Sequence, residues 1–224
     1  GVPGYSTHPY NVINFAFYVS SQSAFYDASL VWSNPSAYFS ATFRDQIAGT
    51  SGATDAEFRA AVKSLYTNAG VTLLLSVGGA TDHPIANGVD PTTLAQTVAN
   101  LVVTYNYDGA DIDWEETSYF NAAGTGETWL ITLTTVLRNQ LGPDYIITHA
   151  PQAPYIGCSY NAGSTAFYPQ GGYLEVHQQV GDMINWYNVQ FYNQGSTPYD
   201  TFNELFVSST GWCLNNAVYQ MIGG

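Results

Sequence analysis

The sequence predicts an α/β fold, namely a (β/α)8 barrel that this chain represents only in part. Strand-like and helix-like segments alternate along the 224 residues, and polar or acidic residues gather where the strands end. Such alternation is typical of parallel strands joined by helical crossovers, and barrel proteins keep their functional sites at the C-terminal ends of the strands. An open dinucleotide-binding sheet is disfavoured, because no Gly-x-Gly-x-x-Gly segment follows a strand.

The number of strands is smaller than a closed barrel requires. About five are evident in the sequence, whereas a barrel needs eight and usually about 250 residues. The chain also ends on Gly223-Gly224 directly after a helical pattern. We therefore expect one domain over residues 1–224, in which the first strand and the last two strands of the barrel are not represented.

The first half of the chain contains clear boundary signals. Val12–Tyr18 (VINFAFY) is a continuous β-rich run, as expected of a buried strand, and a long loop is expected after it. Thr54 and Glu57 form a capping box that opens a helix to about Asn68. Thr72–Val77 (TLLLSV) is the next strand, and a helix begins at Pro91.

The second half continues the alternation. The segments expected there are a strand at Gly109–Glu115, a helix at about Glu127–Leu141, a strand at Tyr145–Thr148, a helix at about Tyr173–Ile184, a strand at Trp186–Phe191 and a last helix from near Phe202 or Ser208 to about Ile222.

Three carboxylates stand at every second position of the Gly109–Glu115 strand: Asp111, Asp113 and Glu115. Side chains alternate along a strand, so all three point to one face, while Ile112 and Trp114 point to the other. A half-exposed polar face would show the same alternation, but only 9% of this chain is charged. Acids this close repel one another, and at least one is expected to keep its proton near neutral pH, as general acid catalysis requires.

Composition and charge exclude several classes of function. Four basic residues stand against 17 acidic ones, for a net charge of −13. Phosphate backbones and anionic membrane surfaces need positive partners, so we expect neither nucleic acid nor membrane binding. The 18 tyrosines and five tryptophans suit neutral ring-shaped ligands such as sugars, and Trp32, Tyr155 and Trp186 are candidate stacking platforms.

Cysteine and histidine give no sign of a metal site. Cys158 and Cys213 could form one disulfide, but two cysteines specify no framework, and no spacing suggests zinc. The four histidines are scattered and are expected to be structural. No signal peptide is visible; the acidic balance and the low lysine content favour a secreted protein.

Four segments resemble the motifs of glycoside hydrolase family 18, which contains chitinases and endo-β-N-acetylglucosaminidases. Residues 108–115 (DGADIDWE) match the DGxDxDxE signature, and residues 75–79 (LSVGG) resemble the SxGG motif on the strand before. Residues 150–152 (APQ) and 189–193 (VQFYN) resemble segments of the fifth and sixth strands in plant class III chitinases and their small fungal relatives.

This resemblance implies catalytic roles for four residues in a retaining, substrate-assisted mechanism. Glu115 is expected to be the general acid, and Asp113 to stabilise the positive charge that develops when the substrate's own acetamido group attacks the anomeric carbon. Asp111 is expected to share a proton with Asp113, and Tyr192 to orient the acetamide oxygen. No metal and no organic cofactor is implied.

The resemblance also implies a set of substrate contacts. Gln190 is expected to contact the sugar or Asp113, although a buried amide that fills the barrel remains an alternative. Backbone at Ser76, Gly78 and Gly79 is expected to approach the substrate, or to form a tight turn. Further candidates are Phe17 and Gln152.

The resemblance leaves the substrate open between two enzymes and a binding protein. An endo-acting chitinase that cuts β-1,4-linked N-acetylglucosamine chains is favoured, acting as a monomer on chitin or its oligosaccharides. An endo-β-N-acetylglucosaminidase that cuts the chitobiose core of N-glycans would use the same residues. A lectin on an inactive barrel is the third possibility, but such proteins usually lose an acid of the signature, and Glu115 and Asp113 are both present.

Overall fold

A computed structural model describes residues 10–156, 168–192 and 201–208 of the chain. Within them, one sheet has the strand order β2-β1-β3-β4-β5-β6. Five of the strands pair in parallel, in the order β1 (Val12–Val19), β3 (Thr72–Gly78), β4 (Gly109–Asp113), β5 (Ile146–His149) and β6 (Trp186–Tyr187). β2 (Ala24–Phe25) pairs antiparallel with the end of β1.

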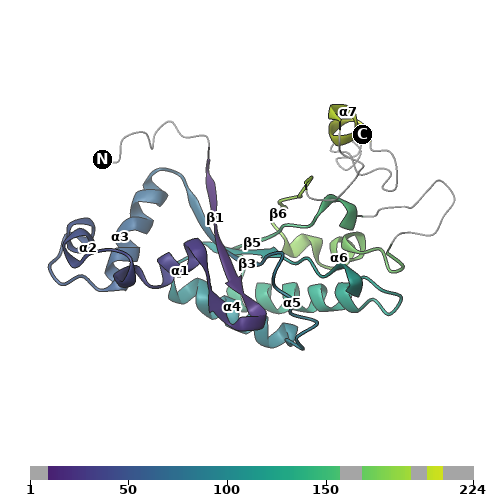
Figure 1. Ribbon diagram of the computed structural model, residues 1–224, viewed down its shortest axis with the longest axis horizontal. Coiled ribbons are helices and arrows are strands. Elements are labelled where there is room, and N and C mark those ends of the chain that lie inside the picture. Colours follow the sequence, from purple (N-terminus) through teal and green to yellow (C-terminus); the bar gives the residue numbers. More distant parts are fainter. Residues whose placement is uncertain (1–9, 157–167, 193–200, 209–224) are drawn as a thin grey trace.

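The predicted barrel architecture is confirmed as an incomplete one. The described strands form an open series with β2 and β6 at its two ends rather than a closed ring. Helices connect successive parallel strands, and Figure 1 shows α4 (Pro91–Thr104) and α5 (Thr125–Leu141) side by side along one face of the sheet. The opposite face is the one to which the acidic residues of β4 point.

The core lies between the sheet and these helices. Leu73, Leu75, Ala110 and Ile147 of the strands have no exposed surface, and neither do Val98 and Leu130 of the helices. Burial of this kind stabilises the fold by roughly 1.5–3 kcal/mol for each large side chain. Side chains alternate along each strand. Since every second one packs against the helices, the others, including the acids of β4, point to the opposite side of the sheet.

Most helix boundaries follow the local signals in the sequence. α3 (Asp55–Asn68) begins at Thr54, whose side chain accepts from the Glu57 backbone while the Glu57 carboxylate accepts from Thr54, as the capping box predicts. α4 begins at Pro91 after the capping residue Asp90. α5 ends at Leu141 before Gly142, which has φ +79°.

Several expectations need correction. The expected loop after β1 contains α1 (Asp27–Ser33) and α2 (Ala41–Ala48). β1, expected to be buried throughout, is buried only at its last two residues, the two that pair with β2. β4 ends at Asp113 and β6 at Tyr187, both short of their expected ends.

The C-terminal helices are shorter than expected. α6 (Tyr173–Val180) continues as a 3-10 turn at Gly181–Met183, so the helical segment expected to reach Ile184 is divided. α7 (Phe202–Phe206) begins at the expected Phe202 but ends at Phe206, because Val207 and Ser208 are not helical. Residues 209–222 of the expected helix lie outside the described residues, as do Cys158 and Cys213. Of the helices described, none combines the length and the apolar composition needed to cross a bilayer.

Candidate active site

Asp111 occupies the centre of a polar row that runs across three strands. It pairs in register with Ser76 of β3 on one side and with Thr148 of β5 on the other. Its Oδ2 accepts from the Ser76 hydroxyl at 3.1 Å, and its Oδ1 accepts from Thr148 at 2.5 Å and from the Asn188 amide at 2.9 Å. Burial raises the pKa of Asp111, and these three donors partly oppose that shift.

Asp113 lies one step closer to the C-terminal edge of the sheet and is 8% exposed. The Gln190 amide donates to its Oδ1 at 2.8 Å and also to the Ala150 carbonyl at 2.7 Å. Burial, together with the negative charges of Glu115 and Asp111, raises the pKa of Asp113 to about 7. This carboxyl group is therefore still partly protonated near neutral pH.

Glu115 lies two residues beyond the end of β4 and is half-buried. Its side chain nevertheless remains close to Asp113, since its negative charge raises the pKa of the Asp113 carboxyl. The Gln152 amide donates to Glu115 Oε2 at 3.1 Å from the loop after β5. The strand prediction was thus too long by two residues, while the predicted proximity of Glu115 and Asp113 is confirmed.

An open cavity of about 410 Å³ lies over the acidic face of the sheet. The predicted site residues that line it are Phe17, Ser76, Asp111, Asp113, Gln190 and Tyr192, together with residues that the sequence did not single out, among them Asn14 and Asn188. Glu115, Gly78, Gly79 and Gln152 are not part of this lining and lie beside it. A cavity with several polar groups on one wall and apolar surface elsewhere is typical of small-ligand sites.

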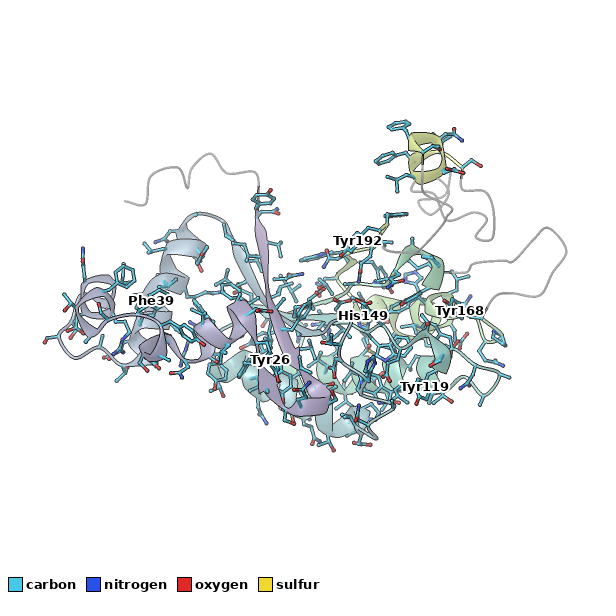
Figure 2. All side chains as sticks on the ribbon, viewed as in Figure 1. Tyr26, Phe39, Tyr119, His149, Tyr168 and Tyr192 are labelled. Atoms are coloured by element: carbon cyan, nitrogen blue, oxygen red, sulfur yellow. The ribbon has the colours of Figure 1, made fainter. Side chains whose placement is uncertain are left out.

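Tyr192 is 61% exposed and lies on the side of the sheet away from α4 and α5 (Figure 2). Partial burial raises the pKa of its phenol, and the charges of Asp113 and Glu115 add to that shift. The phenol is therefore a neutral donor near the two acids at physiological pH. Its role toward a substrate stays a prediction.

Gly78 and Gly79 allow the ends of β3 and β4 to approach each other closely. Gly78 has φ +114°, and a Cβ atom there would lie 2.1 Å from the Asp113 carbonyl oxygen. The Gly79 amide donates to the same oxygen at 2.8 Å, and a Cβ atom on Gly79 would meet the Phe17 ring at 3.2 Å. The tight-turn interpretation of these glycines is confirmed, and their contact with a substrate remains a prediction.

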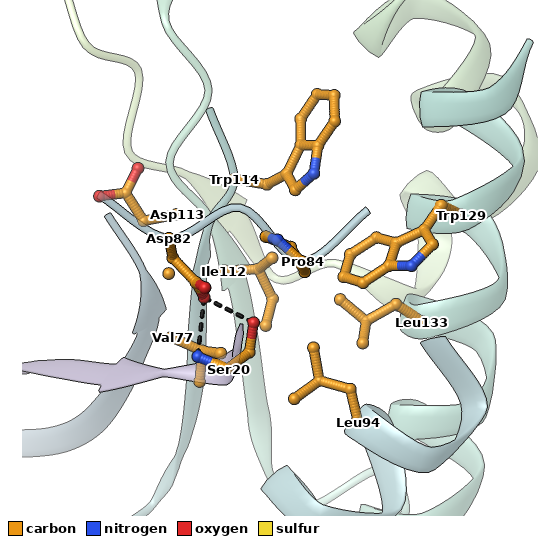
Figure 3. Close-up of a pocket in the computed structure, with 11 residues that line it drawn as sticks. Ser20, Val77, Asp82, Pro84, Leu94, Ile112, Asp113, Trp114, Trp129 and Leu133 are labelled. Carbon is orange, nitrogen blue, oxygen red and sulfur yellow. Dashed lines mark hydrogen bonds between the residues drawn. The ribbon is translucent and has the colours of Figure 1, made fainter. Parts of the chain in front are cut away.

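The other face of β4 packs as predicted. Figure 3 shows Ile112 and Trp114 pointing toward the helices that carry Leu94, Trp129 and Leu133, while Asp113 points the opposite way. These residues surround a small cavity of about 10 Å³, which is the size of one water molecule.

Buried carboxylates anchor the loops next to the site. Asp82 accepts from the Ser20 amide at 2.8 Å, from the Ser20 hydroxyl at 2.5 Å and from the Ser21 amide at 2.9 Å (Figure 3). Glu116 accepts from the amides of Ile85 and Ala86 at 2.7 and 3.0 Å. Both carboxylates therefore hold the 79–90 loop against the segments that follow β1 and β4.

The sequence did not single out Thr148 and Asn188, which make the two shortest hydrogen bonds to Asp111. Asn188, Gln190 and Tyr192 stand at every second position, the same spacing that identified the acids, so Asn188 could have been found by extending that pattern. Thr148 is the last residue of the predicted fifth-strand segment, but its pairing with Asp111 depends on strand register. Glu116 gave no signal, because its partners are backbone amides 30 and 31 residues away.

Two of the three candidate stacking platforms are excluded by burial. Trp32 and Tyr155 are 5% and 3% exposed, so a sugar ring cannot reach their faces. Trp186 is half-buried, and its indole donates to Asn188 at 3.0 Å. His149 is fully buried between Thr134 and Tyr173, and burial lowers its pKa to about 3, in keeping with a structural role.

No group of three or more metal-ligating side chains occurs in the described part of the chain. Asp108, at the opposite end of β4 from the cavity, is paired with Lys63 of α3 and accepts from the Leu73 amide at 2.7 Å. Asp108 therefore fixes the start of β4 against α3 and β3. The site consists of carboxylates, amides and hydroxyls, which are suited to proton transfer and to stabilising positive charge.

Comparison with known proteins gives a consistent result. The model of a family described as "Glycosyl hydrolases family 18" matches residues 3–222. A chitinase of Enterococcus faecalis is 31% identical over 58% of this chain and 39% of its own length. Endochitinase 4 of Metarhizium anisopliae is 27% identical over 83% of this chain and 61% of its own length.

A similar relation holds for solved structures. A family 18 chitinase of Pseudoalteromonas aurantia superposes with a TM-score of 0.61 at 35% identity, over 87% of this chain and 65% of that one. The chain thus spans less than two thirds of the length of these relatives. They come from bacteria and fungi alike, so the narrower resemblance to small fungal and plant class III chitinases stays a prediction.

Proposed function

The chain belongs to glycosyl hydrolase family 18, and we propose that it hydrolyses the β-1,4 linkages between N-acetylglucosamine residues of chitin. One observation carries the proposal: the carboxyls of Glu115 and Asp113 interact beside the cavity, and the pKa of Asp113 is raised to about 7. The names of the relatives, which are chitinases, support the same substrate. Secretion and a monomeric state remain part of the proposal.

Glu115 acts as the general acid in the proposed mechanism. It gives a proton to the glycosidic oxygen of the leaving sugar, so that the C–O bond breaks without expelling an alkoxide. Its half-buried position beside the cavity allows contact with a chain lying across the cavity mouth. After departure of the leaving sugar, the ionised carboxylate takes a proton from the incoming water.

The nucleophile is the carbonyl oxygen of the substrate's own 2-acetamido group. It attacks the anomeric carbon from the face opposite the leaving oxygen and forms an oxazolinium ion, which carries a positive charge. Asp113, fixed by Gln190, stabilises that charge in its ionised form, and Asp111 influences the proton on Asp113 through its own negative charge. Tyr192 donates to the acetamide oxygen and orients it. Water then opens the ring, and two inversions give net retention.

The test is the hydrolysis of chitin hexasaccharide by the natural protein that carries this chain. We expect internal cleavage with the β-anomer appearing first, and a kcat at least about 100-fold lower for Glu115→Gln, since general acids contribute about 10²–10⁴ to the rate. Glu175→Gln is the matched control, because Glu175 is also half-buried and bonded to a glutamine amide, at 3.0 Å, but on α6.

Other outcomes of this experiment would favour one of the alternative functions. Hexasaccharide left intact by the wild type contradicts the chitinase proposal, and cleavage of a high-mannose glycopeptide within its chitobiose core would then indicate an endo-β-N-acetylglucosaminidase. Binding of both ligands without cleavage of either would indicate a lectin. Release of disaccharide units from one end alone would contradict endo action while leaving the reaction itself in place.

A further inference from the structure

Gln152 occupies an unusual position among the residues around the acids. It lies three residues beyond the end of β5, and its side-chain amide nitrogen is 3.1 Å from Glu115 Oε2. It forms an isolated parallel bridge with Gln190, in which the Ala153 amide donates to the Gln190 carbonyl at 2.9 Å and the Gln190 amide donates to the Pro151 carbonyl at 2.8 Å. The backbone of Gln152 is therefore fixed to the strand segment that carries Gln190.

The two bridged glutamines donate hydrogen bonds to different acids. Gln190 donates to Asp113, whereas Gln152 donates to Glu115. Asp113 is the last residue of β4, so strand pairing also fixes its backbone. Glu115 lies beyond the strand, and the terminal torsion of a glutamate side chain has a broad energy minimum. Contacts of its side chain therefore set the orientation of the carboxyl plane: one with Asp113 and one, from outside β4, with the Gln152 amide.

We propose that Gln152 is a positioning residue for the general acid, and not the substrate contact that the sequence suggested. The side-chain amide of Gln152 donates to Glu115 Oε2. The proton that Glu115 transfers is therefore carried by its other carboxyl oxygen, Oε1. Transfer to the leaving oxygen depends on this orientation, while binding of the sugar does not. The inference rests on the proposed function of Glu115 and adds to it the group that orients the acid.

The inference can be tested by varying the leaving group. From the 2,4-dinitrophenyl chitobioside, dinitrophenolate leaves without protonation, whereas the phenyl chitobioside needs the acid to protonate its leaving oxygen. For Gln152→Met, which keeps the length of the side chain and removes the donor, we expect kcat on the phenyl glycoside to fall about 10- to 100-fold, as misplacement of a catalytic group does. On the dinitrophenyl glycoside we expect a change below about threefold, and KM should change little on either.

Gln179→Met is the matched control, because Gln179 donates to Glu175 at 3.0 Å on α6 in the same kind of pair. Thermal unfolding verifies that each variant is folded, and Gln152→Ala replaces the methionine variant if that one fails to fold. Equal losses on both glycosides, or a raised KM with unchanged kcat, would overturn the positioning role. Absence of turnover by the wild type on both substrates would instead refute the proposed function, and this inference with it.

Discussion

At the scale of single residues, the surroundings of Asp113 oppose the ionisation of its carboxyl group. Its pKa is about 7 in the folded protein, because it is removed from water and faces the charges of Glu115 and Asp111. In the unfolded chain its pKa returns to the ordinary value of 3.8. Between about pH 4 and pH 7 the folded state binds more protons than the unfolded state, so the contribution of this carboxyl to stability falls as the pH rises.

The substitution Asp113→Asn removes this titration while its oxygen can still accept from Gln190. We expect little change in unfolding free energy relative to wild type at pH 4, and a gain on the order of 2–4 kcal/mol at pH 8. Urea unfolding at pH 4, 6 and 8 measures the difference. Asp144→Asn, an exposed exchange of the same kind, should show no such trend. A gain that is independent of pH would contradict the explanation.

At the scale of the elements, the site depends on how closely strand ends can approach. Gly109 begins β4 where a Cβ atom would lie 1.8 Å from the Ile146 carbonyl oxygen, and Gly78 ends β3 against the Asp113 carbonyl. These two contacts bring β3, β4 and β5 together at both ends of the acidic strand. The polar row through Asp111 follows from this close packing.

Gly78 and Gly88 allow a matched test of that packing. Both have positive φ, +114° and +70°, but a Cβ atom on Gly88 would meet nothing within 4 Å. We expect Gly88→Ala to lower the free energy of unfolding by about 1–2 kcal/mol, because alanine disfavours this backbone conformation. Gly78→Ala should cost at least about 3 kcal/mol, because the β3–β4 contact must also open. Equal losses in urea unfolding would show that the close approach does not matter.

At the scale of the whole molecule, charge is strongly unbalanced. The chain has a net charge of −13 and a pI of about 4.2. Among the described residues, salt bridges join Arg44 to Asp55 and Lys63 to Asp108. Most acids therefore repel one another in the compact state, and this repulsion lowers stability at neutral pH.

Screening by salt should reverse part of this effect. Raising NaCl from 10 to 100 mM shortens the Debye length from about 30 to about 10 Å. We expect Tm at pH 7 to rise by about 2–4 °C, which corresponds to about 1 kcal/mol for a chain of this size. The rise should vanish near pH 4.2, where the net charge is zero. An equal rise at both pH values would point to a salt effect unrelated to net charge.

Local signals predicted most of the fold because they act over a few residues. The capping box at Thr54 and Pro91 at the start of α4 both lie where the sequence placed them. The helices α1 and α2 were missed, since their aromatic residues show no clear helical period and α2 has no buried residue. β4 was predicted too long because the alternation of acids continues past Asp113, where pairing with β3 ends.

The sequence by itself determined the alternating α/β pattern, the family resemblance and the three acids on one face of β4, because periodicity and motifs are properties of neighbouring residues. Only the tertiary structure decided which donors hold each acid. Ser76, Thr148 and Asn188 reach Asp111 from positions 35, 37 and 77 residues away, and the Gln152–Gln190 bridge divides the amides between Glu115 and Asp113. Such contacts depend on the register between strands, which no local pattern specifies.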